Sequence, residues 1–271
     1  MIKRFIILNI FVLGLFATLA GPVNAQFLVE QGKVNLTVSG GERINKSLLI
    51  HNTTAEEQRV KVYWEDFQYQ PPYDGAKKFF PVGTGVETSA AKWVSFSPQE
   101  FTLEPHGKKE IEYTVSVPAQ FDSGHYGVLF FERASEPYKD QTGMSIVTRV
   151  GSLFFIEPKD IEKKADLKNL KQDVATLTGE FHNMSSVILI PQITYYIMSN
   201  DGMVADRGEI KKLYVPAGVV ANWTIPLSSK LEPGVYSMVI NADLEEGNVV
   251  VKEVGLTKDP SGSLTVSVPQ D

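Results

Sequence analysis

The sequence predicts an all-β protein made of two β-sandwiches in tandem, and two observations support this. Apolar or β-branched residues recur at every second position over short segments, a pattern typical of strands. Turn sequences rich in Gly, Pro, Asn and Asp separate these segments, and such residues favour chain reversals. Regularly spaced strands without helices indicate a sandwich. A short helix around Ile161–Leu170 is the one exception that we expect. The alternating segments are Lys33–Val38, Arg59–Phe67, Ile111–Val117, Tyr126–Phe131, Met144–Val150, Gln192–Met198 and Ser237–Ala242.

An internal repeat predicts that the two sandwiches are copies of one plan. Each half of the chain contains a strand that ends in Asn, then a Pro-x-Gly turn, then an alternating strand, then a Gly-x-Tyr strand. The turn glycine and the later glycine are 17 residues apart in the first half and 16 in the second. These positions are Asn52, Gly107 and Gly124 in the first copy, and Asn183, Gly218 and Gly234 in the second.

The first 25 residues have the pattern of a secretory signal. Lys3 and Arg4 precede an apolar run from Phe5 to Ala20, and small residues follow up to Ala25, where we expect cleavage. No second apolar run is long enough to span a membrane, so we expect no transmembrane segment in the mature chain. The protein is then exported to the periplasm or the cell surface. Retention of the apolar run as an N-terminal anchor is the alternative.

The boundary between the sandwiches is expected in the charged stretch Glu157–Asp166, where the alternation stops. Such polar stretches are typical of domain linkers. The first copy is enlarged by an aromatic insert from Asp66 to Ala91. We therefore divide the chain into a signal peptide (1–25), a first sandwich (26–158), a linker (159–166), a second sandwich (167–257) and a C-terminal tail (258–271).

Composition excludes several classes of function. Removing residues 1–25 takes away two of the 26 Lys and Arg residues and none of the 32 Asp and Glu residues, which leaves a formal charge of −8. An acidic chain without a basic face disfavours nucleic acid as a partner. The chain has no cysteine, which excludes thiol catalysis and cysteine-ligated zinc. We expect no metal and no other cofactor.

The four histidines do not indicate a catalytic or metal site. His106 lies between Pro105 and Gly107 in a turn, and Ala217 takes its place in the second copy. His51 and His182 both precede the Asn at the end of a strand, which indicates a repeated structural position, and His125 belongs to the Gly-x-Tyr motif. No metal-binding spacing and no nucleophile motif accompanies them. We therefore expect no enzyme activity and no catalytic residue.

The aromatic insert is a candidate recognition surface. It carries more aromatic side chains than one face of a strand can bury, and the second copy lacks it. Exposed aromatics favour contact with a protein or a glycan. Padding of the first sandwich is the alternative role for these residues. They are Phe67, Tyr69, Tyr73, Phe79 and Phe80.

Several motifs together carry a resemblance to known families. The stretches "KVNLTVSGGERINKSLLIHNTTAEEQRVKVYWEDF", "WVSFSPQEFTLEPHGKKEIEYTVSVP", "GHYGVLFFE" and "VTRVGSLFFIEP" resemble the N-terminal immunoglobulin-like domain of periplasmic pilus-assembly chaperones. They resemble more closely that of the WxL-interacting surface proteins. The resemblance covers Lys33 to Pro158 and implies two immunoglobulin-like domains. It also implies a partner that is another envelope protein or peptidoglycan.

The pilus chaperones hold a subunit by adding a strand to it and by gripping its C-terminal carboxylate with two basic residues. The resemblance places Lys33 at the first of these basic positions. Where the family has the second, before the hydrophobic run, this chain has Ser152 or Leu153, and Arg149 is shifted away.

The stretch from Gly143 to Pro158 is the predicted binding strand. Sandwich topology makes it the last strand of the first domain, near a sheet edge, and edge strands invite pairing unless charges blunt them. Arg149 is its only charge before Glu157. We expect a partner strand to pair along Met144–Val150. The alternate side chains Met144, Ile146, Thr148 and Val150 would then pack between the sandwiches, whereas in the alternative this is an interior strand.

The sequence therefore predicts an exported, non-catalytic protein that binds another envelope protein through a sheet edge. A structural or adhesive surface protein that binds cell-wall glycan is the alternative.

Overall fold

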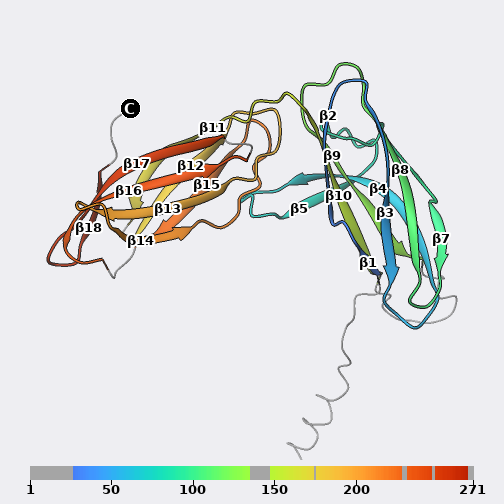
Figure 1. Cartoon of the computed structure of the whole chain (residues 1–271), viewed down its shortest axis with the longest axis horizontal. Helices are drawn as coiled ribbons and strands as arrows, with labels where there is room; N and C mark the ends of the chain where they lie inside the picture. The colour runs from blue at the N-terminus through green and yellow to red at the C-terminus, as the bar shows by residue number, and fades with distance from the viewer. Residues whose placement is uncertain (1–26, 135–146, 174, 228–230, 246–247, 268–271) are drawn as a thin grey trace, which may run out of the picture.

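The computed structural model describes residues 27–134, 147–173, 175–227, 231–245 and 248–267. The predicted signal peptide lies outside these residues. The described chain forms two β-sandwiches side by side and contains no helix, as Figure 1 shows with the first sandwich on the right. The predicted fold class, two tandem immunoglobulin-like sandwiches, is confirmed.

The first sandwich packs a four-stranded sheet against a six-stranded sheet. One strand crosses between them: the chain leaves β1, passes Glu30–Gly32 and enters β2 in the other sheet. All pairings between its strands are antiparallel except that of β2 with β10, and an isolated parallel bridge joins Ser89 to Tyr126. The first sheet has the order β1 (Phe27–Val29), β3 (Arg43–Asn52), β8 (Lys108–Ser116) and β6 (Val94–Ser97). The second has the order β2 (Lys33–Val38), β10 (Arg149–Pro158), β9 (His125–Arg133), β4 (Gln58–Tyr69) and β5 (Lys77–Pro81), with β7 (Glu100–Leu103) also paired to β4.

The second sandwich packs a three-stranded sheet against a five-stranded sheet, and all its pairings are antiparallel. The three-stranded sheet has the order β11 (Ala165–Asp173), β12 (Thr176–Asn183) and β15 (Val220–Pro226). The five-stranded sheet has the order β14 (Val204–Glu209), β13 (Gln192–Ser199), β16 (Gly234–Asp243), β17 (Val249–Lys258) and β18 (Leu264–Ser267).

Three details of the predicted organisation are wrong. The segment expected to be a short helix, Ile161–Leu170, enters β11 at Ala165, because β12 offers it a partner strand. The predicted linker, 159–166, therefore loses its last two residues to that strand. The predicted tail, 258–271, contains β18, which pairs with β17 through a tight turn.

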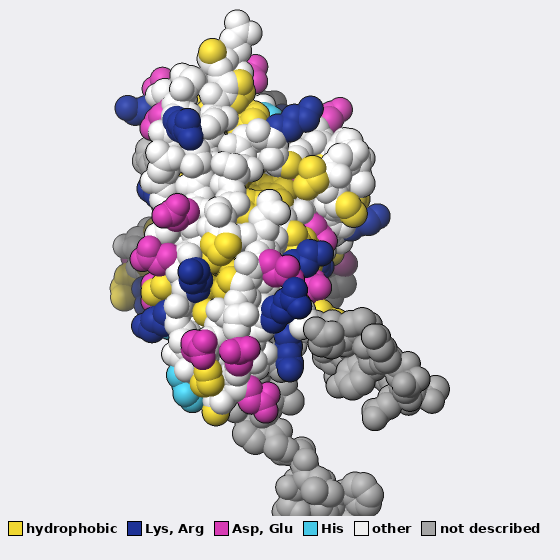
Figure 2. Space-filling view, turned by 90° about the vertical axis from the view of Figure 1, so that its right-hand side faces the viewer, with side chains coloured by type: hydrophobic (Ala, Val, Ile, Leu, Met, Phe, Trp, Pro, Cys, Tyr) yellow, Lys and Arg dark blue, Asp and Glu magenta, His cyan; other side chains and the backbone are white. Residues whose placement is uncertain are grey.

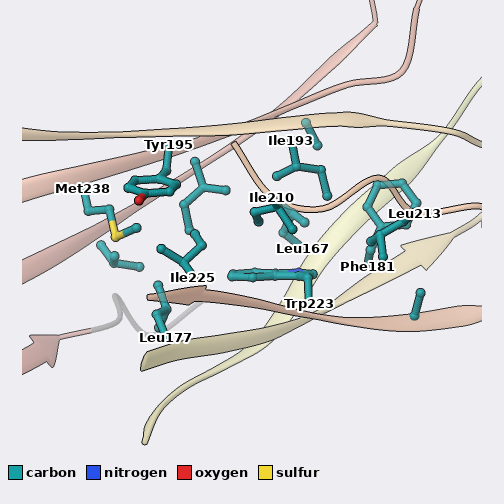
Figure 3. Packing of buried hydrophobic residues seen from close by; sticks show 14 of the residues in the cluster. Leu167, Leu177, Phe181, Ile193, Tyr195, Ile210, Leu213, Trp223, Ile225 and Met238 are labelled. Atoms are coloured by element: carbon teal, nitrogen blue, oxygen red, sulfur yellow. The ribbon is translucent and has the colours of Figure 1, made fainter. Parts of the chain in front are cut away.

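Each sandwich has its own hydrophobic core, built from the inward faces of alternating strands. In β8, for example, Ile111, Tyr113 and Val115 are buried, while Glu110, Glu112 and Ser116 are exposed and Thr114 is half-buried. The core of the second sandwich surrounds Trp223, which lies flat among aliphatic and aromatic side chains of both sheets (Figure 3). Outside the cores, acidic and basic side chains are interspersed with hydrophobic ones on the end of the molecule formed by the first sandwich (Figure 2).

The repeat in the sequence corresponds to a repeated hydrogen-bonded bracket. The side-chain amide of Asn52 donates to the backbone carbonyls of Glu56 and Glu104, at 2.7 and 2.9 Å. That of Asn183 donates to those of Val187 and Val215, at 2.8 and 2.9 Å. In both copies one side chain thus ties the end of a strand to two separate loops by hydrogen bonds to their backbone carbonyls.

Candidate partner-binding site

The predicted binding strand is interior over one half and open over the other. All of β10 up to Ile156 pairs with β9, but β2 pairs with it only from Leu153 onward. On the side facing away from β9, Arg149–Ser152 therefore has no strand partner among the described residues. The Ser152 hydroxyl bonds to the carbonyl of Gln31, which closes the end of this opening. Met144 and Ile146 lie outside the described residues.

The side chains of β10 do not point as expected. Val150 was predicted to face the space between the sandwiches together with Thr148. In the structure Val150 packs against the first core, on the same face as Phe154 and Ile156. Thr148 precedes the strand and is half-buried. Strand alternation then places Leu153 and Phe155 on the outer face, where they join the cluster between the sandwiches.

Arg149 is held by its own sheet. Its guanidinium lies 4.0 Å from the ring centre of Phe130 and donates to the Tyr63 hydroxyl and the Glu65 carboxylate, each at 3.2 Å. Charge-assisted bonds and a ring face together hold an arginine firmly. Burial, followed by the hydrogen bond to Glu132, raises the pKa of Tyr63. Arg149 thus braces the outer face of the sheet next to the open part of β10.

Lys33 begins β2 and lies beside a small hollow between the sandwiches. Its ammonium group is 4.0 Å from the ring centre of Phe155. The hollow measures about 110 Å³ and is lined by Lys33, Glu157, Lys163 and Glu245, with aliphatic side chains of both sandwiches around them. Lys33 therefore lies in the cleft between the two sandwiches, and its role as a carboxylate ligand stays a prediction.

The cleft contains acids that the sequence reasoning did not single out. Lys163 is buried and lies 3.3 Å from Glu245, while the Tyr126 hydroxyl donates to Glu157 at 3.2 Å. Burial raises the pKa of Glu157, and Lys163 opposes this effect. Desolvation lowers the pKa of Lys33, with Glu157 acting in the opposite direction. Two members of this network, Glu157 and Lys163, lie in the charged stretch Glu157–Asp166 that the sequence assigns to the domain boundary.

The aromatic insert is not an exposed recognition surface, and that prediction needs correction. Phe67 and Tyr69 are 2% and 4% exposed, because the outer face of the sheet is covered by the second sandwich. The ring of Tyr69 stacks on Tyr214 with centroids 4.9 Å apart, and the Tyr214 N–H donates to the Tyr73 carbonyl at 2.8 Å. In Figure 1 the hairpin of β4 and β5 reaches from the first sandwich toward the second.

The other two aromatics of the insert are only partly buried. Phe79 packs at the edge of the same cluster, and Phe80 lies under the ammonium of Lys78, 5.1 Å from its ring centre. Most of the insert therefore joins the two sandwiches.

The histidines occupy structural positions. His106 sits at an exposed turn with φ of 56°. His51 and His182 bond to Glu30 and Glu180, at 2.9 and 2.7 Å, and the His125 ring lies against Trp93. Within the described ranges no three His, Asp or Glu side chains gather as a metal site. No helix of the described chain is long and apolar enough to cross a membrane.

Comparisons with known proteins identify the fold. No family model and no curated protein matches the chain. Among solved structures, it is similar to a chain in the chaperone–tip adhesin complex of CFA/I fimbriae biogenesis, with 13% identity, a TM-score of 0.52, and coverage of 84% of this chain and 98% of that one.

Two further solved structures are similar over most of their length. The class 5 fimbriae chaperone CfaA has 13% identity, a TM-score of 0.49 and coverage of 90% and 100%. The complex of Salmonella enterica SafA pilin with the SafB chaperone has 10% identity, a TM-score of 0.46 and coverage of 88% and 98%. At these identities the likeness shows a shared fold, and a fold does not fix a function.

Proposed function

We propose that this protein is an exported, non-catalytic, chaperone-like binding protein of the cell envelope that holds another envelope protein by sheet-edge pairing. Periplasmic location or exposure at the cell surface follows from the predicted signal peptide. The observation that carries the proposal is the unpaired side of β10 at Arg149–Ser152. Likeness in fold to a chain of a chaperone–adhesin complex supports it. The resemblance to WxL-interacting surface proteins stays a prediction.

The backbone of β10 offers hydrogen bonds to a partner at defined residues. The Thr148 carbonyl accepts from Arg133, toward β9, and the Leu153 N–H donates to Gly32, toward β2. In an antiparallel ladder successive residues point their N–H and C=O groups to opposite sides. Arg149 and Gly151 therefore direct theirs to the open side. A partner strand would bond to these groups, and Lys33 would face the partner from the neighbouring cleft.

The glycan-binding alternative loses its supporting observation. It rested on an exposed set of aromatic side chains, and the structure buries Phe67 and Tyr69 between the sandwiches. Sugar-binding surfaces stack rings that face solvent. We therefore propose a protein partner and do not propose peptidoglycan or another glycan.

A pair of substitutions at Arg149 tests the proposal. Arg149→Ala removes the side chain but keeps the edge N–H, whereas Arg149→Pro removes the N–H as well. Proline is tolerated on the open edge of a strand. A lost backbone hydrogen bond of about 1 kcal/mol should weaken capture of the envelope partner about fivefold more in Arg149→Pro than in Arg149→Ala.

Capture is measured by pull-down from envelope extract, followed by titration with the purified partner. Both variants should stay folded, with similar melting temperatures. If the alanine and proline variants bind the partner with equal affinity, the open side of β10 is not part of the binding site.

A further inference from the structure

The crossing of the first strand leaves a second open edge in the first sandwich. β1 pairs with β3 only at Ile50–Asn52, after which the chain turns away toward the other sheet. The remainder of β3, Arg43–Leu49, pairs with β8 on one side. On the other side, no strand of the described chain pairs with it. A seam therefore separates β3 in one sheet from β2 in the other.

Backbone groups of β3 point into this seam. The Leu49 carbonyl accepts from the Glu30 N–H at 3.1 Å, on the β1 side, whereas the Asn52 N–H donates to Gly107 at 2.9 Å, on the β8 side. Alternation along the strand then places the N–H and C=O groups of Asn45 and Ser47 on the open side. Such a row of donors and acceptors is a template for another strand.

A hollow of about 450 Å³ lies beside this edge, with a buried tyrosine at its wall. Tyr113 is 2% exposed and its ring packs against Phe154. Within the part of the chain that the structure describes, the Tyr113 hydroxyl has no hydrogen-bond partner. Burial raises the pKa of Tyr113, so the hydroxyl stays protonated and can donate. Tyr113 lines the hollow, so a ligand oxygen there could accept a hydrogen bond from its hydroxyl.

The charge of the hollow is positive. Lys46 occupies a core-facing position of β3, between Ile44 and Leu48, yet it remains exposed and no carboxylate of a described residue pairs with it. Lys33 also lines the hollow, but its ammonium group lies over Phe155 in the cleft between the sandwiches. The lining is otherwise neutral, with Gln31, Val34, Asn35, Ser47 and Tyr113. A lysine at this position, with no acid beside it, favours an anionic group in the hollow.

We propose that this seam binds an extended acidic segment of a polypeptide, which adds to β3 as a strand and places a carboxylate between Lys46 and the Tyr113 hydroxyl. The inference rests on the proposed function in that the occupant is a polypeptide. A free anion could bind Lys46 and the Tyr113 hydroxyl, but it could not pair with the backbone N–H and C=O groups of Asn45 and Ser47. Only a strand has backbone groups at the spacing that these require.

The test uses a blocked peptide and the mature full-length chain. The peptide is acetyl-Thr-Thr-Val-Glu-Val-Thr-Thr-amide. A control peptide has Gln in place of Glu and is otherwise identical. Blocked ends exclude recognition of a terminal carboxylate. Binding is followed by calorimetry and by amide shifts in NMR spectra. We expect the Glu peptide to bind about tenfold more tightly than the Gln peptide and to shift the amides of Asn45 and Ser47.

Two variants and a matched control assign the contacts. Lys46→Gln should abolish the preference for the Glu peptide, and Tyr113→Phe should weaken its binding severalfold without changing side-chain volume. Lys109 is exposed on β8, outside the seam, so Lys109→Gln removes the same charge there and should change the affinity less than twofold.

Three outcomes would overturn the inference. Equal binding of the Glu and Gln peptides would remove the role of Lys46 as an anion ligand. Shifts at Arg149 and Gly151 in place of Asn45 and Ser47 would move the site to β10. Absence of saturable binding would mean that Lys46 only protects an edge strand from pairing. Arg149→Pro should leave peptide binding unchanged, so failure of the proposed function at β10 is distinguishable from failure of this site.

Discussion

In the first sandwich the indole of Trp64 packs on the backbone of Gly127, and in the second that of Trp223 packs on Gly179. A Cβ added at Gly127 would lie 2.1 Å from Cζ2 of Trp64, and one added at Gly179 would lie 2.3 Å from Cζ2 of Trp223. The two glycines lie on different strands of their sandwiches. Both cores thus depend on a glycine that lets a tryptophan approach the sheet closely.

The outer faces of the two sandwiches differ. In β9 of the first sandwich, buried residues run continuously from Tyr126 to Phe131, because the insert and the second sandwich cover the sheet. In β16 of the second, buried and less buried residues alternate from Tyr236 to Ala242. The two sandwiches therefore have similar interiors but different outer faces. In the first, both faces of the sheet that contains β9 are buried, whereas in the second one face of the sheet that contains β16 is left to solvent.

The largest expected effect is the loss of the tryptophan–glycine contact. Gly127→Ala and Gly179→Ala should each lower the free energy of unfolding by about 3 kcal/mol, since an added methyl group must displace the indole or the strand. Native-state hydrogen exchange separates the two sandwiches. We expect Gly127→Ala to lower protection in the first and Gly179→Ala in the second.

Gly32→Ala is the matched control, because a Cβ there meets no atom within 4 Å. It should change stability by less than about 0.5 kcal/mol. A cost at Gly127 or Gly179 no larger than this would show that the sheets adapt to the methyl group.

The asparagine brackets are expected to come next in size, and to be unequal. Removing either amide breaks its hydrogen bonds to two loops, and each lost bond costs about 1 kcal/mol, more where its groups are buried. The two closest bonds of Asn183 are both buried, whereas those of Asn52 are partly exposed. Asn183→Ala should therefore destabilise its sandwich by about 2 kcal/mol and Asn52→Ala by about 1 kcal/mol.

Chemical denaturation of the two variants measures this difference. Asn222→Ala is the control, because Asn222 is exposed on β15. A larger loss of stability in Asn52→Ala than in Asn183→Ala would contradict the expectation that the buried bonds of Asn183 contribute more than the partly exposed bonds of Asn52.

The smallest expected effect concerns the contact between the aromatic insert of the first sandwich and the second sandwich. Tyr214→Ala removes the ring that stacks on Tyr69, and such pairs contribute about 1 kcal/mol beyond the area they bury. We expect a modest fall in melting temperature and a broader distribution of domain orientations in small-angle X-ray scattering.

Tyr196→Ala is the control for this change, because Tyr196 lies on the solvent-facing side of β13. An unchanged scattering profile for Tyr214→Ala would show that the other contacts between the sandwiches suffice to fix their orientation.

Much of the strand pattern was predictable, and the failures have local causes. The alternation of Ile111, Tyr113 and Val115 gave β8 directly, since each strand exposes one face. β11 was mistaken for a helix because its pairing with β12 shifts register between Lys168 and Lys171. Such an irregularity breaks the two-residue period in the sequence.

The candidate site was predictable only in part. The unpaired stretch of β10, Arg149–Ser152, shares only two residues with the expected pairing segment, Met144–Val150. Alternation alone does not tell which of two apolar faces is the core, so Val150 was assigned to the wrong one. Phe67 and Tyr69 appeared to exceed the capacity of one strand face because the surface that buries them belongs to the second sandwich. The seam at Lys46 had no signal in the sequence, since it arises where β1 and β2 separate.

The sequence by itself determined the class of fold, the duplication and the absence of thiol chemistry, because these depend on composition and on the spacing of neighbouring residues. The tertiary structure alone decided which strand edges stay open, which face of β10 is buried and where the aromatic insert docks. Hydrogen bonding across a sheet and packing between sandwiches join residues far apart in the chain, as Tyr69 meets Tyr214. Local periodicity carries no record of such partners.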